Sequence, residues 1–326
     1  LFHYIEREDT LYFDFTHGFR SVPILFSTAI GFLQKSKRIA LQHAFYGYLE
    51  DKDKATGQII DMVDFYRIND WADGVASLVQ SADPSQLNRL AEKEQEDSPF
   101  QAITDPKLIA ALDELTLKLQ SVDVENVGPA ATEVCTLIAK KHDPESTAPD
   151  QYLLEMLLEK FQLLSSGKFK RYDKSYFQTQ LTLIQVLIEH QFLMQAFTAM
   201  RELIGTIGVS RIFDVSGMQK QSTEYHRSRA DIFCSMCQFP VKKWKFESIL
   251  EGKTGKLKDF HRLKAYWETM SEEQHVELQS VAKTIAGLRN GFDHAWLGKK
   301  GVPKNVKESC DDLYRRLRRL IDVLIV

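Results

Sequence analysis

The sequence is poor in cysteine and has no long apolar run and no strong excess of charge of either sign. Four cysteines occur among 326 residues, too few in a chain of this length for the disulfide framework of a small secreted protein. No apolar run reaches the length of a transmembrane helix, and the first residues do not resemble a signal peptide. We therefore expect a cytoplasmic protein that has no membrane partner.

Signals for a metal are weak as well. Cys234 and Cys237 have the spacing of half a zinc site, but no second pair follows, and His226 is the only histidine nearby. Reduced, half-buried thiols are the favoured interpretation, with no metal. No paired acidic motif stands out, so a metal-dependent nuclease ranks last among the functions we consider.

The net charge of −3 argues against a uniformly basic nucleic-acid binder, but the charge is unevenly spread. Residues 241–326 hold 18 Lys and Arg against 12 Asp and Glu. A basic C-terminal third is compatible with RNA contact in that region.

The first part of the chain has the pattern of an α/β sheet. A strand, a helix and two further strands are predicted in that order, and a turn over residues 52–57 would pair the last two strands as a hairpin. The expected ranges are Thr10–Asp14, Val22–Leu33, Ile39–Leu49 and Gln58–Phe65. A complete doubly wound domain needs more strands before Leu1.

Helical periodicity dominates from Asp70 onward. Loops are expected over residues 143–150, 214–228 and 252–258. The helices that we expect are 71–80, 86–94, one opening at Asp105-Pro106, 130–140, 151–164, two within 177–207 that break near His190-Gln191, one beginning at Ser271, and 310–326. The helix at Ser271 should begin with a capping box over Ser271–Gln274. Its predicted apolar stripe consists of Leu278, Val281, Ile285, Leu288 and Phe292.

The turn after the first strand offers groups that bind anions. Thr16 and Ser21 supply hydroxyls, His17 and Arg20 supply cationic donors, and Gly18 permits close backbone approach. The alternative is a strand–helix corner in which Thr16 and Ser21 cap the helix. The residues alone leave the two interpretations open.

Arg289, Asn290 and His294 near the end of the chain are the groups needed to cleave RNA without a metal. At about 100° per residue, His294 lies roughly 140° round the helix from Arg289, while Asn290 and His294 share a face. Either Gly291 deforms the last turn, or a second copy supplies matching groups across a two-fold axis. A surface arginine and a helix-ending histidine are the structural alternative.

Two basic segments are possible RNA contacts. Lys242, Lys243 and Lys245 interleave with aromatic residues, as in surfaces that hold phosphates and stack bases. A helix start with Trp244 packed inward is the favoured alternative for this segment. The last helix carries arginines, among them Arg315 and Arg319, and a solvated face explains them more simply than an RNA path.

Two of these motifs together resemble one known family. Asp14–Gly18 (Asp-Phe-Thr-His-Gly) resembles the motif of the CRISPR-associated DxTHG-motif proteins, and Arg289–His294 resembles the Arg-x4-6-His motif of HEPN ribonucleases. The family's layout implies a Rossmann-like CARF sensor, here its C-terminal portion only, then helices and a HEPN helical domain. The corresponding domain ranges are 1–70, 71–210 and 211–326.

The resemblance implies a type III CRISPR accessory ribonuclease that works as a homodimer. Cyclic oligoadenylate would bind the CARF part through Thr16, His17 and Gly18, with Arg20 as a further candidate contact from the same turn, and would activate cleavage of single-stranded RNA. No cofactor is implied. Arg289 and His294 match the catalytic pair and Asn290 its polar neighbour, and attack by the 2′-hydroxyl would leave a 2′,3′-cyclic phosphate. The alternative is a catalytically silent helical module that binds RNA or a protein partner.

Overall fold

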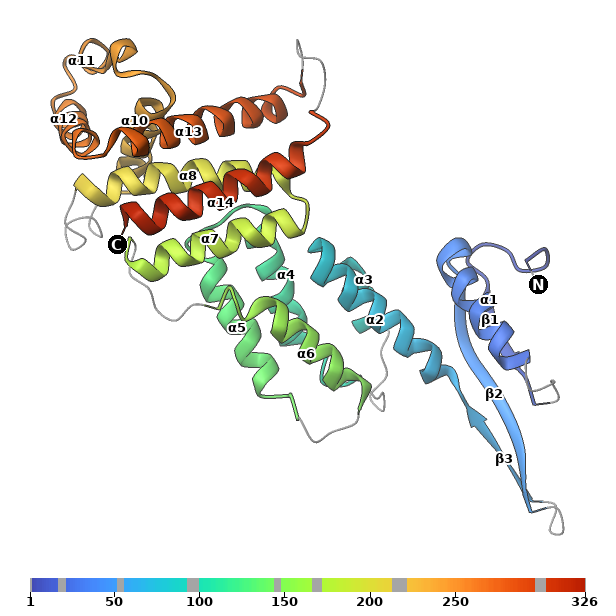
Figure 1. Ribbon diagram of the computed structural model, residues 1–326. Coiled ribbons are helices and arrows are strands. Elements are labelled where there is room, and N and C mark those ends of the chain that lie inside the picture. Colours follow the sequence, from blue (N-terminus) through green and yellow to red (C-terminus); the bar gives the residue numbers. More distant parts are fainter. Residues whose placement is uncertain are drawn as a thin grey trace. The chain divides into compact units, whose positions relative to one another are not determined.

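A small sheet at the N-terminus leads into a long series of helices in the computed structural model of the chain (Figure 1). This confirms an α/β start followed by a mostly helical region. The structure describes residues 2–16, 22–51, 56–92, 100–143, 148–165, 172–212, 222–296 and 303–325. The chain divides into two compact units. The first comprises Leu1–Leu78, Pro84–Ile109 and Lys141–Leu157, and the second comprises Val79–Asp83, Ala110–Lys140 and Leu158–Val326. The three expected domain ranges stay a prediction.

The sheet of the first unit has three strands in the order β1-β2-β3. β1 (Thr10–Asp14) runs parallel to β2 (Ala40–Asp51), and α1 (Val22–Lys37) connects them. β2 pairs with β3 (Thr56–Asp61) in antiparallel register, with Phe45 opposite Asp61. The predicted strand–helix–strand order and the hairpin are therefore confirmed.

The third strand is shorter than the sequence predicted. It ends at Asp61, and Val63–Phe65 already belong to α2 (Val63–Ser81). The Asp61 carboxylate explains the change of direction, because its Oδ1 accepts from the Val63 amide at 3.0 Å and from the Ala44 amide at 3.1 Å. A side chain that accepts from an amide two residues ahead ends a strand and opens a helix.

The helices that follow mostly match their expected positions. They are α3 (Ser85–Ala91), α4 (Pro106–Gln120), α5 (Val127–Ala139) and α6 (Pro149–Phe161). Asp105 caps α4 as expected, since its Oδ1 accepts from the Lys107 amide at 2.7 Å. The expected end of the α3 helix and residues 144–147 of the expected 143–150 linker lie outside the described residues, and Pro149 and Asp150 of that linker already belong to α6.

α8 (Leu193–Ile212) is the central helix of the second unit. It packs against α7 (Lys174–Glu189), α10 (Thr223–Gln238), α12 (Thr254–Glu268), α13 (Glu272–Asp293) and α14 (Val306–Leu324), and Figure 1 shows it running beside α7 and α14. Close approach of α10 depends on glycine, because a Cβ at Gly208 would lie 2.2 Å from the Phe233 ring. α8 is therefore buried over most of its length.

Several boundaries in this unit differ from the predictions, among them those of α7 and α8, which begin at Lys174 and end at Ile212 rather than lying within 177–207. The expected loop over residues 214–228 ends early, because Ser222 caps α10 by accepting from the Tyr225 amide at 3.2 Å; residues 213–221 lie outside the described residues. The expected loop over residues 252–258 ends where α12 begins at Thr254. The last helix, expected from Cys310, begins at Val306. Runs of polar residues predicted loops, but these residues lie on exposed turns of packed helices.

The predicted break between α7 and α8 is confirmed. α7 ends at Glu189, and Gln191 adopts a left-handed backbone with φ of 59° before α8 begins. His190 lies in this break and is buried, with 6% of its surface exposed, and neither ring nitrogen has a hydrogen-bond partner. Burial, aided by the charge of Lys160, lowers the pKa of His190 to about 4.

We expect this histidine to make the second unit sensitive to acid. Below its ordinary pKa of 6.5, the imidazole is protonated in the unfolded chain but stays neutral in the folded one, so stability falls as the pH drops from 6.5 towards 4. At pH 5 the loss amounts to about 2 kcal/mol relative to pH 7. Urea unfolding of wild type and His190→Leu at pH 7, 6 and 5 measures it. The free energy of unfolding of His190→Leu should rise relative to that of wild type as the pH falls. A difference between the two proteins that is the same at all three pH values would contradict the assignment.

Candidate functional site

The helix that carries Arg289 and His294 is α13, and its start is capped as the sequence predicted. Ser271 and Gln274 form a reciprocal capping box. The Ser271 Oγ accepts from the Gln274 amide at 3.2 Å, and the Gln274 Oε1 accepts from the Ser271 amide at 2.8 Å. Leu278, Val281 and Ile285 are buried on one face, so the predicted apolar stripe anchors the helix in the bundle.

The other end of α13 closes in a Schellman arrangement. The Trp296 amide donates to the Gly291 carbonyl at 2.7 Å, and the Ala295 amide donates to the Phe292 carbonyl at 3.1 Å. Ala295 has a positive φ of 46°. A Cβ at Gly291 would lie 2.4 Å from the Trp296 ring, which folds back over this position. Gly291 therefore makes room for Trp296, and α13 stays helical through Asp293.

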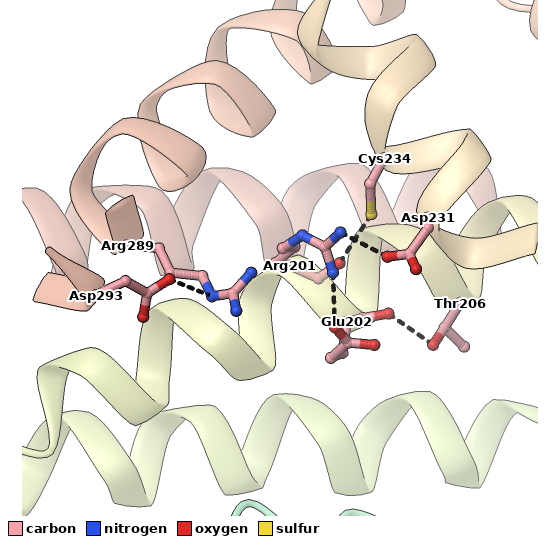
Figure 2. Close-up of polar contacts among 7 residues, drawn as sticks. All are labelled: Arg201, Glu202, Thr206, Asp231, Cys234, Arg289 and Asp293. Carbon is pink, nitrogen blue, oxygen red and sulfur yellow. Dashed lines mark hydrogen bonds and ion pairs between the residues drawn. The ribbon is translucent and has the colours of Figure 1, made fainter. Parts of the chain in front are cut away.

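Arg289 points from α13 towards α8 (Figure 2). Its side chain is 32% exposed, and its Nε lies 3.5 Å from the Asp293 Oδ2, one helical turn away. That geometry makes an ion pair but no hydrogen bond, and the Nε is a buried donor with no hydrogen-bond partner. The guanidinium is thus held near one carboxylate without being fully satisfied by it.

Arg289 lines a cavity of about 550 Å³ in the second unit. α7, α8, α10, α13 and residues 121–125 form its walls. Arg201 lines it too, but Arg201 donates to Glu202 at 2.8 Å and to Asp231 at 2.6 Å (Figure 2). Because two carboxylates already meet Arg201, Arg289 is the better placed of the two to hold an added anion.

His294 and Asn290 do not share this cavity with Arg289. Both are exposed at the end of α13, and neither is among the residues that line the cavity. Across the described residues, no hydrogen bond or ion pair joins Arg289 to the His294 side chain. Within the described part of one chain the predicted pair is therefore not joined, in agreement with the helical spacing.

The turn predicted to bind the activator is only partly described. His17, Gly18 and Arg20 lie outside the described residues. The Thr16 hydroxyl donates to the Asp14 Oδ1 at 2.6 Å and accepts from the Gly47 amide at 2.8 Å. Thr16 therefore ties the end of β1 to β2. Ligand binding by this turn stays a prediction.

The favoured interpretation of the 241–246 segment is confirmed. Residues Val241–Lys243 form the short 3-10 helix η1. The Trp244 Nε1 donates inward to the Phe239 carbonyl at 2.8 Å, and its ring lies 5.6 Å from that of Trp267. The three lysines Lys242, Lys243 and Lys245 are exposed around it. This half-buried tryptophan packs against the core, and RNA contact by the three lysines stays a prediction.

Arg315 and Arg319 lie on the exposed face of α14. Arg315 is 71% exposed and lies 3.9 Å from Asp312. Arg316, between them, has a structural role, because it donates twice to the Glu277 carboxylate at 2.7 Å and so joins α14 to α13. RNA contact by Arg315 and Arg319 stays a prediction.

The paired cysteines are more buried than expected. Cys234 and Cys237 are free thiols packed inside the bundle, and burial raises the pKa of Cys234 to about 12. Within the described ranges, no three His, Cys, Asp or Glu side chains gather as metal ligands do.

Sequence reasoning missed the other cavity residues. Tyr172, Gln180 and His226 line the cavity with Arg289, but they come from separate segments with no shared motif. Gln180 carried the one usable signal, because it is a polar residue on the apolar face of a helix and is buried there.

Comparison with known proteins finds one informative similarity. No family model matches the chain, and none of its described helices combines the length and apolarity of a membrane span. The chain is 18% identical over 313 residues to a CRISPR-associated protein of Methanocaldococcus jannaschii, and the match covers 96% of this chain. The chain spans 41% of that relative's length. This similarity, which extends along nearly the whole chain, supports a CRISPR-associated protein.

Proposed function

We propose that the chain is part of a type III CRISPR accessory effector that cleaves single-stranded RNA without a metal once cyclic oligoadenylate binds its CARF part. One observation carries the proposal: the sensor motif at Asp14–Gly18 and the nuclease motif at Arg289–His294 occur in one chain that is similar, over 96% of its length, to a CRISPR-associated protein. Each motif alone is short, but the family needs both in this order.

The proposed chemistry uses only the chain's own residues. The 2′-hydroxyl of the RNA loses its proton and attacks the adjacent phosphorus, the bond to the 5′-oxygen breaks, and that oxygen takes up a proton. A 2′,3′-cyclic phosphate and a free 5′-hydroxyl result. Arg289 stabilises the charge that builds on the phosphate, and His294 transfers a proton or positions the hydroxyl. Asn290 lies exposed beside His294 as its polar neighbour.

The geometry supports a site shared by two copies of the chain. Within one copy Arg289 lines a cavity, whereas His294 is exposed on another side of the helix end. A two-fold axis that passes near the end of α13 would place the Arg289 of one copy beside the His294 of the other. We therefore propose a homodimer as the active form.

One feature favours the alternative of a silent binding module. Arg289 already pairs with Asp293 of its own chain, at 3.5 Å, so a phosphate must compete with this carboxylate. If the Asp293 carboxylate keeps Arg289 away from the phosphate, RNA would bind but would not be cut.

Cleavage of a labelled single-stranded RNA in EDTA, with and without cyclic tetra- or hexaadenylate, tests the proposal. We expect cleavage that persists in the chelator, depends on one of the two rings and leaves a cyclic phosphate end. A requirement for added Mg²⁺ or Mn²⁺ would overturn the mechanism. Cleavage that ignores both rings would remove the sensor part of the proposal, and binding without cleavage would select the silent module.

A further inference from the structure

The cavity that Arg289 lines contains two buried polar atoms that lack a hydrogen-bond partner among the described residues. One is the Gln180 Oε1, an acceptor on a side chain of a residue that is only 4% exposed. The other is the Arg289 Nε, a donor. Buried polar atoms are almost always paired, and an unpaired one is destabilising. The Arg289 Nε is ion-paired with Asp293 at 3.5 Å but makes no hydrogen bond, so the Gln180 Oε1 is the stronger indication of a ligand in this cavity.

An aromatic side chain stands in the same wall. Tyr172 is half-buried, and its hydroxyl lies 2.8 Å from the His226 Nδ1. Its ring lies 5.5 Å from the His226 ring, nearly parallel to it at 29°, and 5.5 Å from the Tyr176 ring at 66°. These contacts hold the tyrosine ring in place, and Tyr172 is a half-buried residue of the cavity lining. Tyrosine rings are surfaces on which nucleobases stack.

The size of the cavity fits a nucleotide. Its volume of about 550 Å³ falls in the range of pockets that take small organic ligands. The lining carries both signs of charge, because Asp123, Glu125, Glu202 and Asp231 line it together with three arginines. Arg201 pairs with Glu202 and Asp231, and arginine holds phosphates with paired donors, so Arg289 and the exposed Arg227 are the candidates to contact a phosphate.

We propose that this cavity binds one unpaired nucleobase of the single-stranded RNA, stacked on Tyr172, with its exocyclic amino group donating to the Gln180 Oε1 while Arg289 contacts a neighbouring phosphate. The inference rests on the proposed function, because it assigns a base subsite on the RNA that the ribonuclease would cut. Adenine, cytosine and guanine carry an exocyclic amino group, and uracil does not.

Direct binding tests the subsite without cleavage. The protein carries His294→Ala so that labelled oligomers of adenylate, cytidylate and uridylate of equal length stay intact, and fluorescence anisotropy gives each affinity. We expect the adenylate and cytidylate oligomers to bind about tenfold more tightly than the uridylate oligomer, the effect of one buried hydrogen bond.

Two substitutions in that background separate the contacts. Gln180→Met keeps the length of the side chain and removes the acceptor, so it should lower the adenylate and cytidylate affinities to the uridylate level and leave the uridylate affinity unchanged. Tyr172→Leu should weaken all three by about fivefold or more, because stacking does not depend on the amino group. Equal affinities for the three oligomers, or an equal loss for all three in Gln180→Met, would overturn the proposal.

The stability of Gln180→Met without RNA is a second readout. Removing an unpaired buried acceptor should leave the urea midpoint unchanged or raise it. A marked fall in the midpoint would show that the amide has a structural partner in the free protein, and would overturn the assignment.

Cleavage by the unsubstituted protein in EDTA, measured in parallel, keeps the two proposals apart. If it cuts RNA but shows no base preference, the subsite is wrong and the nuclease stands. If it binds with the expected preference but does not cut, the subsite stands and the nuclease is wrong.

Discussion

Arg289→Ala and His294→Ala should each lower RNA cleavage by about 10²–10⁴-fold, the range that transition-state charge stabilisation and proton transfer supply. The loss of Arg289 removes the charge that stabilises the phosphate. The loss of His294 removes a proton carrier, and its exposed position at the helix end makes a folding defect a poor explanation. Arg289→Lys should also be strongly impaired, because lysine keeps the charge but lacks the planar fork. Single-turnover cleavage in EDTA is the measurement.

Matched controls exist elsewhere in the chain. Arg89 is an exposed arginine on α3, and His261 is an exposed histidine on α12, and neither lies near the end of α13 in sequence. Arg89→Ala and His261→Ala should cleave at the wild-type rate. All variants should unfold at the wild-type urea midpoint. Wild-type cleavage by purified Arg289→Ala or His294→Ala would refute the assignment of the catalytic pair.

Asp259→Ala should destabilise the second unit by about 3–5 kcal/mol, because it leaves a buried guanidinium without its carboxylate. The Arg229 Nε donates to the Asp259 Oδ2 at 2.8 Å, and the two side chains are only 7% and 5% exposed. The Tyr225 hydroxyl also donates to Asp259, at 3.0 Å, and the Arg229 guanidinium stacks 3.6 Å over the Tyr225 ring. This cluster joins α10 to α12, so the loss of the Asp259 carboxylate should weaken the packing of both helices against α8.

Urea unfolding followed by circular dichroism measures the effect, and two further variants identify its cause. Asp259→Asn keeps an acceptor for Tyr225 but not the charge, so we expect a smaller loss. The double substitution Arg229→Met with Asp259→Leu removes both charges and should recover most of the stability lost in Asp259→Ala. A loss below about 1 kcal/mol in Asp259→Ala would instead indicate a weak, surface-like ion pair.

Local patterns were sufficient to predict most elements. The capping box at Ser271, the proline that opens α4 and the break at His190-Gln191 were all predicted, because each depends on residues within a few positions along the chain. The boundary of β3 that the prediction missed has a cause that is partly long-range. β3 ends at Asp61 because that carboxylate accepts from the amide of Ala44 on the neighbouring strand.

The sequence by itself determined the order of the elements, the α/β start and the two motifs whose co-occurrence suggests the function. Only the tertiary structure decided which residues surround Arg289. Gln180, Tyr172 and His226 meet it in one cavity because α7, α10 and α13 converge on α8. Helical periodicity predicts which face of a helix is buried. It does not predict which distant helix covers that face, because side-chain packing between segments far apart in the chain determines the partner.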